Sequence, residues 1–328
     1  MVAIRRILVA IKDPTARTFP AVTKAAQIAT AFGSKIELFH DMTTTLYTGF
    51  PGGIVSDAHA FEREHRAARL VQLEKIATPL LDRGLRVSVA ADWDYPAHEA
   101  IVRRAMATKA DLIVAQHHPG KHRLTWLLSF ADWELLRMSP VPVLLVKSPR
   151  PYRHPVVLAA IDPLHAFGKP ARLDSRILGL GALMAKGLRG KLHAVHAYTT
   201  LQVGAAVPAV VAGARIGMEM EREAAAIAGA AFTRALRSTR IARGGRHLVG
   251  GDPANVIVEV SRKIGSTIVV LGALSRSGIK RAFIGNTAER LIDELRSDLL
   301  VVKPARFRIR IPRAQRGVRV VQTPAAMP

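Results

Sequence analysis

The chain alternates short apolar runs with longer segments in which apolar residues recur at helical spacing. Residues 7–11, 143–146 and 299–302 consist of Val, Ile, Leu and Ala, which is typical of parallel strands buried on both faces. In residues 19–29 and 68–81, apolar side chains return every three or four positions, which predicts amphipathic helices. This alternation predicts an α/β fold with a doubly wound parallel sheet and right-handed crossovers.

The same order of elements occurs twice, at an offset of roughly 156 positions, which indicates a duplication. The matched segments are 7–11 with 157–161, 33–40 with 190–196, 111–114 with 266–269, and 143–147 with 299–303. In this alignment Gly33 stands opposite Gly190. Each half holds five strand candidates, so we expect two tandem Rossmann-like domains, each a five-stranded parallel sheet with helices on both faces.

The domain bounds follow from composition. Residues 148–151 read SPRP and form a polar, proline-rich boundary, so the domains are expected at residues 1–148 and 154–304. Residues 305–328 hold six arginines and no acid. This basic tail is interpreted as loosely ordered, with a strand added to a sheet edge or a basic arm for membranes or nucleic acid as alternatives.

Composition narrows the class of protein. The chain has no cysteine, so it has neither disulfides nor thiolate metal sites, and a cytoplasmic location is expected. No export signal is visible, and the charge-free run 192–214 is broken by His, Gln, Gly and Pro, so it is expected to be a loop rather than a membrane span.

Some polar residues have structural explanations. Asp252 is expected to cap a helix that begins at Pro253. His117, His118 and His122 lack a recognised metal-ligand spacing. We therefore expect no metal beyond a magnesium ion that accompanies a nucleotide.

The most informative stretch is VVLGALSRSGIKRAFIGNTAERLI, residues 269–292. In open α/β sheets, ligands bind beyond the carboxyl ends of the strands where the strand order reverses. The loops expected there after the first and fourth strands of the second half contain Asp162, Pro163, Gly272, Ser275, Gly278, Gly285, Asn286 and Thr287. Gly272 would allow a backbone conformation at the end of the strand that residues with a side chain rarely adopt. Gly278 and Gly285 would let the backbone approach a ligand closely. Asn286, as N-cap, would open a helix whose free N–H groups attract phosphate, although a plain turn and a capped helix explain the same residues.

This stretch resembles the nucleotide-binding signature of the universal stress protein family, in which spaced glycines wrap the phosphates of ATP. Gly272 and Gly285 keep the spacing, whereas Ser275 replaces the second glycine and Asn286 replaces a hydroxyl residue. The resemblance covers about 300 residues, is greatest to tandem members, and implies a strand order 3-2-1-4-5. It also implies that Asp162 contacts adenine.

The first half departs from the family pattern. Lys12 and then Asp13 stand at the position of Asp162, and Ser129 and Phe130 replace Gly285 and Asn286. We therefore expect the first domain to have lost the phosphate cradle.

The resemblance implies a cytoplasmic stress-response regulator or ligand sensor rather than an enzyme. The second domain would bind a small anionic ligand, ATP or another adenine nucleotide. The two halves would form an intramolecular pseudo-dimer, in a chain that is a monomer or a homodimer.

A different class of function stays open. The formal net charge of +23 would attract polyanions, so the alternative is a non-enzymatic binder of a polyanion or acidic membrane through the basic surface and tail. Genome composition and solubility explain the same charge and are the favoured interpretation. Apolar loops at 43–55 and 201–214 would alternatively cover a hydrophobic ligand.

Overall fold

The computed structural model describes residues 3–42, 46–48, 58–117, 126–164, 172–198, 211–273, 286–305, 307, 311–317 and 320–322. The chain forms two compact units, one of residues 3–151 with 308–328 and the other of residues 152–307. The final segment therefore does not stand apart as a tail but groups with the first unit.

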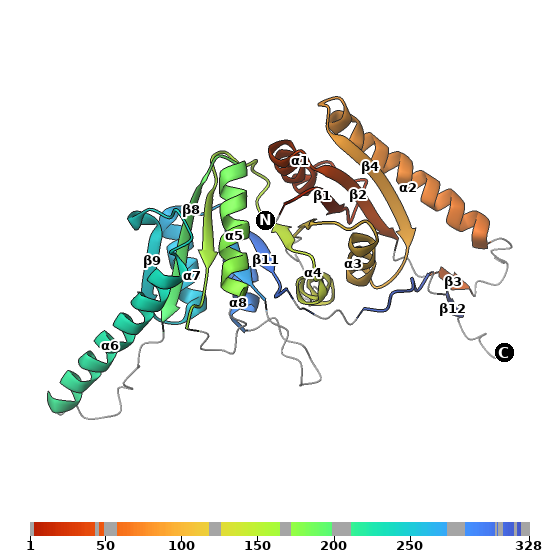
Figure 1. Ribbon diagram of the computed structural model, residues 1–328. Helices are drawn as coiled ribbons and strands as arrows, with labels where there is room; N and C mark the ends of the chain where they lie inside the picture. The colour runs from red at the N-terminus through yellow and green to blue at the C-terminus, as the bar shows by residue number, and fades with distance from the viewer. Residues whose placement is uncertain are drawn as a thin grey trace, which may run out of the picture. The chain divides into compact units, whose positions relative to one another are not determined.

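The first unit is a parallel α/β sheet (Figure 1). Its strands, in their order across the sheet, are β4 (Arg86–Trp93), β2 (Lys35–Met42), β1 (Arg6–Ala10), β5 (Leu112–Gln116) and β6 (Val143–Val146). Its helices are α1 (Pro20–Phe32), α2 (Ala58–Leu81), α3 (Ala97–Ala107) and α4 (Trp126–Met138). Helix α3 packs on α4, and right-handed crossovers place this pair on one face of the sheet and α1 and α2 on the other.

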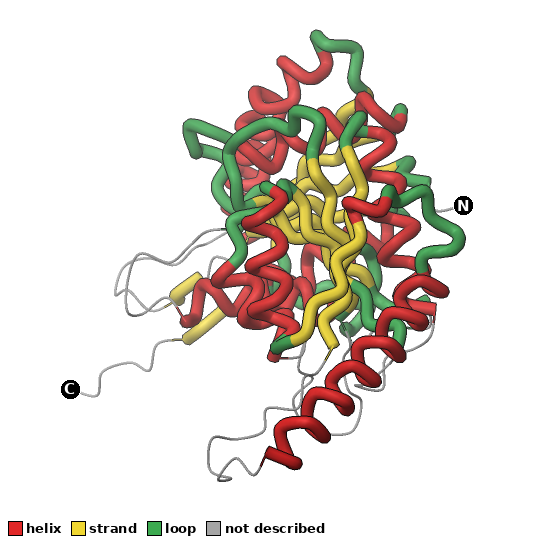
Figure 2. Tube along the Cα trace, turned by 90° about the vertical axis from the view of Figure 1, so that its left-hand side faces the viewer, coloured by secondary structure: helices red, strands yellow, loops and turns green. Residues whose placement is uncertain are grey.

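The second unit repeats this arrangement. Its strands, in their order across the sheet, are β9 (Arg246–Gly250), β8 (Lys191–Tyr198), β7 (Val156–Ala160), β10 (Ile268–Gly272) and β11 (Asp298–Val302). Its helices are α5 (Arg172–Gly187), α6 (Val211–Ala235), the short 3₁₀ turn η1 (Arg243–Gly245), α7 (Pro253–Ile264) and α8 (Asn286–Glu294). In both units the order, counted along the chain, is third, second, first, fourth, fifth. Figure 2 shows strands in yellow flanked by helices in red. The predicted α/β class with tandem domains is confirmed.

The central strands are buried as their sequences predict. Leu8, Val9, Leu158 and Val270 are at most 1% exposed, which is expected of a parallel sheet covered by helices on both faces. Within the described ranges, no helix is both long and apolar enough to cross a membrane.

Helix α7 begins as the sequence predicts. The Asp252 carboxylate accepts a hydrogen bond from the Asn255 N–H at 3.1 Å, and Pro253 occupies the first helical turn. The helix ends at Gly265, whose φ of 61° is left-handed, a conformation that glycine adopts without steric cost.

Strand register corrects the alignment of the halves in more than one place. Leu112 pairs with Ile7 and Ile268 pairs with Val157, so residues 111–114 match 267–270 rather than 266–269. Lys35 of β2 pairs with Arg6, and Lys191 of β8 pairs with Val156, so these two lysines are equivalent. Counting back two residues sets Gly33 opposite Arg189 rather than Gly190. Both have left-handed backbone, with φ of 66° and 55°, because both end the preceding helix.

The C-terminal segment adds a small second sheet to the first unit. Strand β12 (Val320–Gln322) pairs in parallel with β3 (Leu46–Thr48). This sheet is separate from the main sheet of the unit, so the segment does not extend the edge that the sequence offered as an alternative.

Candidate functional site

The pairing of β7 with β10 positions the candidate site of the second unit. Ile268, Val269 and Val270 pair with Val157, Leu158 and Ala159 in parallel register, so the carboxyl ends of the two strands are neighbours. Asp162 and Pro163 follow β7, and Gly272 ends β10. The structure therefore brings these three predicted residues to one edge of the sheet.

The loop after β7 is anchored to α5. The Asp162 N–H donates to the Asp174 carboxylate at 3.1 Å, and Asp174 lies in the first turn of α5 with only 5% of its surface exposed. This contact is made by the Asp162 backbone and not by its carboxylate.

Gly272 serves a different purpose from the expected one. It is absent from the glycines with positive φ among the described residues, so the chain does not leave β10 at an unusual angle. A Cβ at this position would lie 2.6 Å from Leu173 Cδ2 and 3.1 Å from Ile177 Cδ1. Glycine is required here because α5 packs closely over the end of the strand.

The remaining predicted residues fall at or before α8. Asn286 and Thr287 are the first two residues of the helix, so Asn286 lies inside the helix rather than at the N-cap. Ser275, Gly278 and Gly285 lie outside the described residues, as do most of the apolar loops at 43–55 and 201–214. Gly285 immediately precedes the helix, where free N–H groups attract anions.

Sequence reasoning missed a duplicated histidine on the second strand of each unit, which contacts the residue that follows the first strand. His40 Nδ1 donates to the Ile11 carbonyl at 2.8 Å, and His196 Nδ1 donates to the Ile161 carbonyl at 3.2 Å. Both carbonyls directly precede the residues at the candidate ligand position, and burial lowers the pKa of His40. The repeat itself carried the signal, since strand register makes His40 and His196 equivalent.

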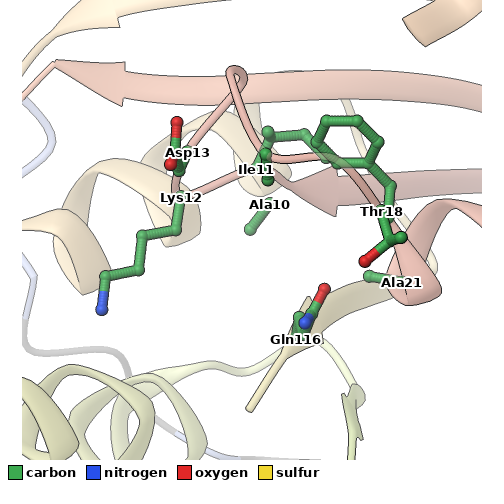
Figure 3. A pocket seen from close by; sticks show the side chains of 9 residues that line it. Ala10, Ile11, Lys12, Asp13, Thr18, Ala21 and Gln116 are labelled. Carbon is green, nitrogen blue, oxygen red and sulfur yellow. The ribbon is translucent and has the colours of Figure 1, made fainter. Parts of the chain in front are cut away.

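The first unit retains a pocket at the corresponding strand end (Figure 3). Its lining is Ala10, Ile11, Lys12, Asp13, Ala16, Thr18, Phe19, Ala21 and Gln116. Figure 3 shows the Lys12 side chain extending away from Thr18 and Gln116. The pocket is lined by polar as well as apolar groups.

The Asp13 carboxylate accepts hydrogen bonds from a residue close to it in the sequence. The carboxylate accepts from the Thr15 hydroxyl at 2.6 Å and from the Thr15 N–H at 2.8 Å, and these hydrogen bonds lower its pKa. Asp13 therefore stabilises a turn, and the residue that strand register sets opposite Asp162 is Lys12.

The first of the three histidines after β5 also has a local partner, whereas His118 and His122 lie outside the described residues. His117 Nδ1 lies 3.0 Å from Asp132 Oδ2 of α4, which fixes the start of the next loop. Among the residues that the structure describes, no three His, Asp or Glu side chains converge as metal ligands would.

Comparison with known proteins identifies the family. The model of the Universal stress protein family matches residues 3–147 and 170–303, which correspond to the two units. The chain belongs to the universal stress protein family.

Relatives and solved structures agree with this tandem assignment. Universal stress protein E of Salmonella typhi is 28% identical, over 90% of this chain and 93% of that protein. Universal stress protein E of Photorhabdus laumondii is 27% identical, over 94% of this chain and 98% of that protein. A crystal structure of a functionally unknown protein from Pseudomonas aeruginosa PAO1 has a TM-score of 0.67 and 28% identity, covering 92% of this chain and 94% of that one.

Proposed function

We propose that this tandem universal stress protein is a non-enzymatic stress-response regulator whose second unit binds ATP or another adenine nucleotide. The observation that carries the proposal is the β7–β10 pairing, which sets Asp162 beside Gly272 at neighbouring strand ends. Such a position, beyond the carboxyl ends of parallel strands, is where α/β sheets bind ligands.

Each part of the site has a role under this proposal. The Asp162 carboxylate accepts a hydrogen bond from the adenine amine or a ribose hydroxyl. The N-terminus of α8, which begins at Asn286, offers N–H groups and the positive end of a helix dipole to phosphate. A magnesium ion would arrive with the nucleotide phosphates rather than occupy a site of its own.

The test compares equivalent positions in the two halves. ATP is titrated calorimetrically into the wild type, Gly285→Val and Ser129→Val at low and high salt. Saturable, salt-tolerant binding is expected in the wild type and Ser129→Val but not in Gly285→Val, because a side chain at residue 285 would block the close approach of phosphate. Nucleotide at about one hundred times its Kd should also raise the free energy of unfolding by about 2.7 kcal/mol.

Two results would overturn the proposal. One is the absence of ATP binding, and the other is binding that both valine variants weaken equally. If the protein released phosphate from ATP faster than ATP hydrolyses in buffer, only the claim that the protein is not an enzyme would be contradicted.

Binding of a polyanion is the second candidate, favoured by the net charge of +23. Counterion release makes such binding fall steeply with ionic strength, so the salt arm of the same titration separates the two functions.

A further inference from the structure

Two acidic side chains and one arginine form a compact cluster at the carboxyl end of β4 in the first unit. Arg103 of α3 donates to both oxygens of Asp94, at 2.7 and 2.8 Å, and to Glu99 at 3.0 Å. The Asp94 and Arg103 side chains are only 2% and 8% exposed. This cluster therefore holds two carboxylates against one internal guanidinium.

The neighbouring imidazole does not supply the missing positive charge. Burial lowers the pKa of His98 to about 4, with Arg137, Arg103 and Arg316 acting in the same direction against Glu99. His98 is accordingly neutral near pH 7, and the cluster lacks one cation.

A residue from the far end of the chain supplies that cation. The Arg316 N–H donates to Asp94 Oδ1 at 2.9 Å, and Arg316 Nη2 donates to Glu99 Oε1 at 3.0 Å. The Arg316 guanidinium carbon lies 5.9 Å from the centre of the Tyr95 ring, within the range of a cation–π contact. Arg103 Nη1 donates in addition to the Pro312 carbonyl at 3.2 Å.

The segment's own backbone is shaped for this contact. Gly317, directly after Arg316, has a φ of 67°, which allows a turn that other residues rarely adopt. Beyond the turn, β12 pairs with β3. Arg313 and Arg316 are both exposed, but of these two only Arg316 forms an ion pair with Glu99.

We propose that Asp94 and Glu99 form a recognition site for an arginine-bearing peptide segment, and that the chain fills this site with its own residues 312–316. The site reads one guanidinium, one backbone N–H and one backbone carbonyl, so it selects an extended segment with a single correctly placed arginine rather than positive charge in general. The Arg316 side chain is 41% exposed, so the contact is open to exchange with a second arginine-bearing segment.

The first experiment measures amide hydrogen exchange of residues 311–317 in the full chain. Arg316→Ala should speed exchange in this segment at least about tenfold, because it removes a hydrogen bond to a charged group. Arg313→Ala removes the same charge from the same segment and should leave exchange unchanged. Fast exchange in the wild type, or equal effects of the two variants, would overturn the proposal.

The second experiment tests recognition in trans. A labelled peptide of residues 311–322 is titrated into the full-length Arg316→Ala chain, and binding is followed by fluorescence anisotropy. Saturable binding is expected to this vacated site and at least about tenfold weaker binding to the wild type, whose site is filled. The same peptide carrying Arg313→Ala should bind, and the peptide carrying Arg316→Ala should not.

The matched peptides decide between recognition and simple charge attraction. Equal binding of the two alanine peptides, or binding of neither, would overturn the proposal. A Glu99→Gln change added to the Arg316→Ala chain should abolish peptide binding, and retained affinity would count against the assigned site.

Discussion

Each unit has an acid just after its third strand, and the two acids have opposite surroundings. Strand register sets Asp94 opposite Gly251, so Asp94 and Asp252 occupy adjacent rather than identical positions. In the first unit, Asp94 is buried and bound by Arg103, the Tyr95 N–H and the C-terminal segment. In the second, Asp252 caps α7 and pairs with Arg290 at 2.9 Å, but Asp252 and Arg290 are 48% and 44% exposed. The same strand end thus carries a buried ionic cluster in one half and a solvated helix cap in the other.

This difference shows how duplication separates roles. Helix capping needs only one acceptor at the helix N-terminus, so Asp252 can cap α7 while its carboxylate stays solvated. The first unit desolvates the Asp94 carboxylate and must compensate its charge fully. That compensation comes partly from a segment more than two hundred positions away along the chain, since Asp94 and Arg316 are separated by 222 residues.

The largest expected effect is the loss of the buried acid. Asp94→Ala should lower the free energy of unfolding by about 3–5 kcal/mol, because it leaves Arg103 buried beside a single carboxylate. Asp252→Ala should cost about 1–2 kcal/mol, from the helix cap and a solvated ion pair. Urea denaturation of both variants measures the difference, and equal losses would contradict the contrast between the two positions.

A second comparison concerns a buried carboxyl group that the second unit lacks at the matching position. Asp41 of β2 corresponds to Ala197 of β8 by strand register. Although part of the residue reaches the surface, burial of its carboxyl raises its pKa to about 7, with Asp94 raising it further and Lys12 opposing the shift. The folded chain therefore keeps a proton that the unfolded chain releases once the pH exceeds the usual range of an aspartic acid.

Asp41→Asn should consequently stabilise the protein in a pH-dependent way. Wild-type stability falls as the pH rises from about 4 to about 7, because the folded state binds more protons than the unfolded state in this window. The variant lacks this loss, so its advantage in Tm should be small at about pH 5 and full at about pH 8. A difference in Tm that does not change with pH would argue against a raised pKa at Asp41.

The fold was predictable because its signal is local and repeated. Unbroken apolar runs such as 7–11 and 299–302 can only be buried strands in a chain of this kind, and their second occurrence supports the first. Asp252 was also predictable, since a cap and its helix are adjacent in sequence. The strand ends that carry Asp162 and Gly272 followed from the same reasoning.

What the sequence could not supply depends on contacts between distant residues. The sequence suggested that Gly272 is needed for its backbone conformation. The structure shows that a Cβ is instead excluded by Leu173 and Ile177, which belong to a helix about a hundred positions earlier. The arginines of the C-terminal segment look alike in sequence, and only the tertiary structure sets Arg316 against Glu99. His40 and His196 were within reach, because the duplication aligns them.

The smallest expected effect tests the corrected alignment of the two halves. Arg189 and Gly33 both adopt left-handed backbone at the end of the first helix of their unit. A side-chain-bearing residue is strained there by roughly 1 kcal/mol relative to glycine, so Arg189→Gly should stabilise the protein by about 1 kcal/mol and Gly33→Ala should destabilise it by about as much. Open space around Gly33, with no atom within 4 Å of an added Cβ, makes this a test of conformation alone. Urea midpoints that shift in opposite directions, with unchanged slopes, would support the equivalence of Gly33 and Arg189, and a loss of stability in both variants would contradict it.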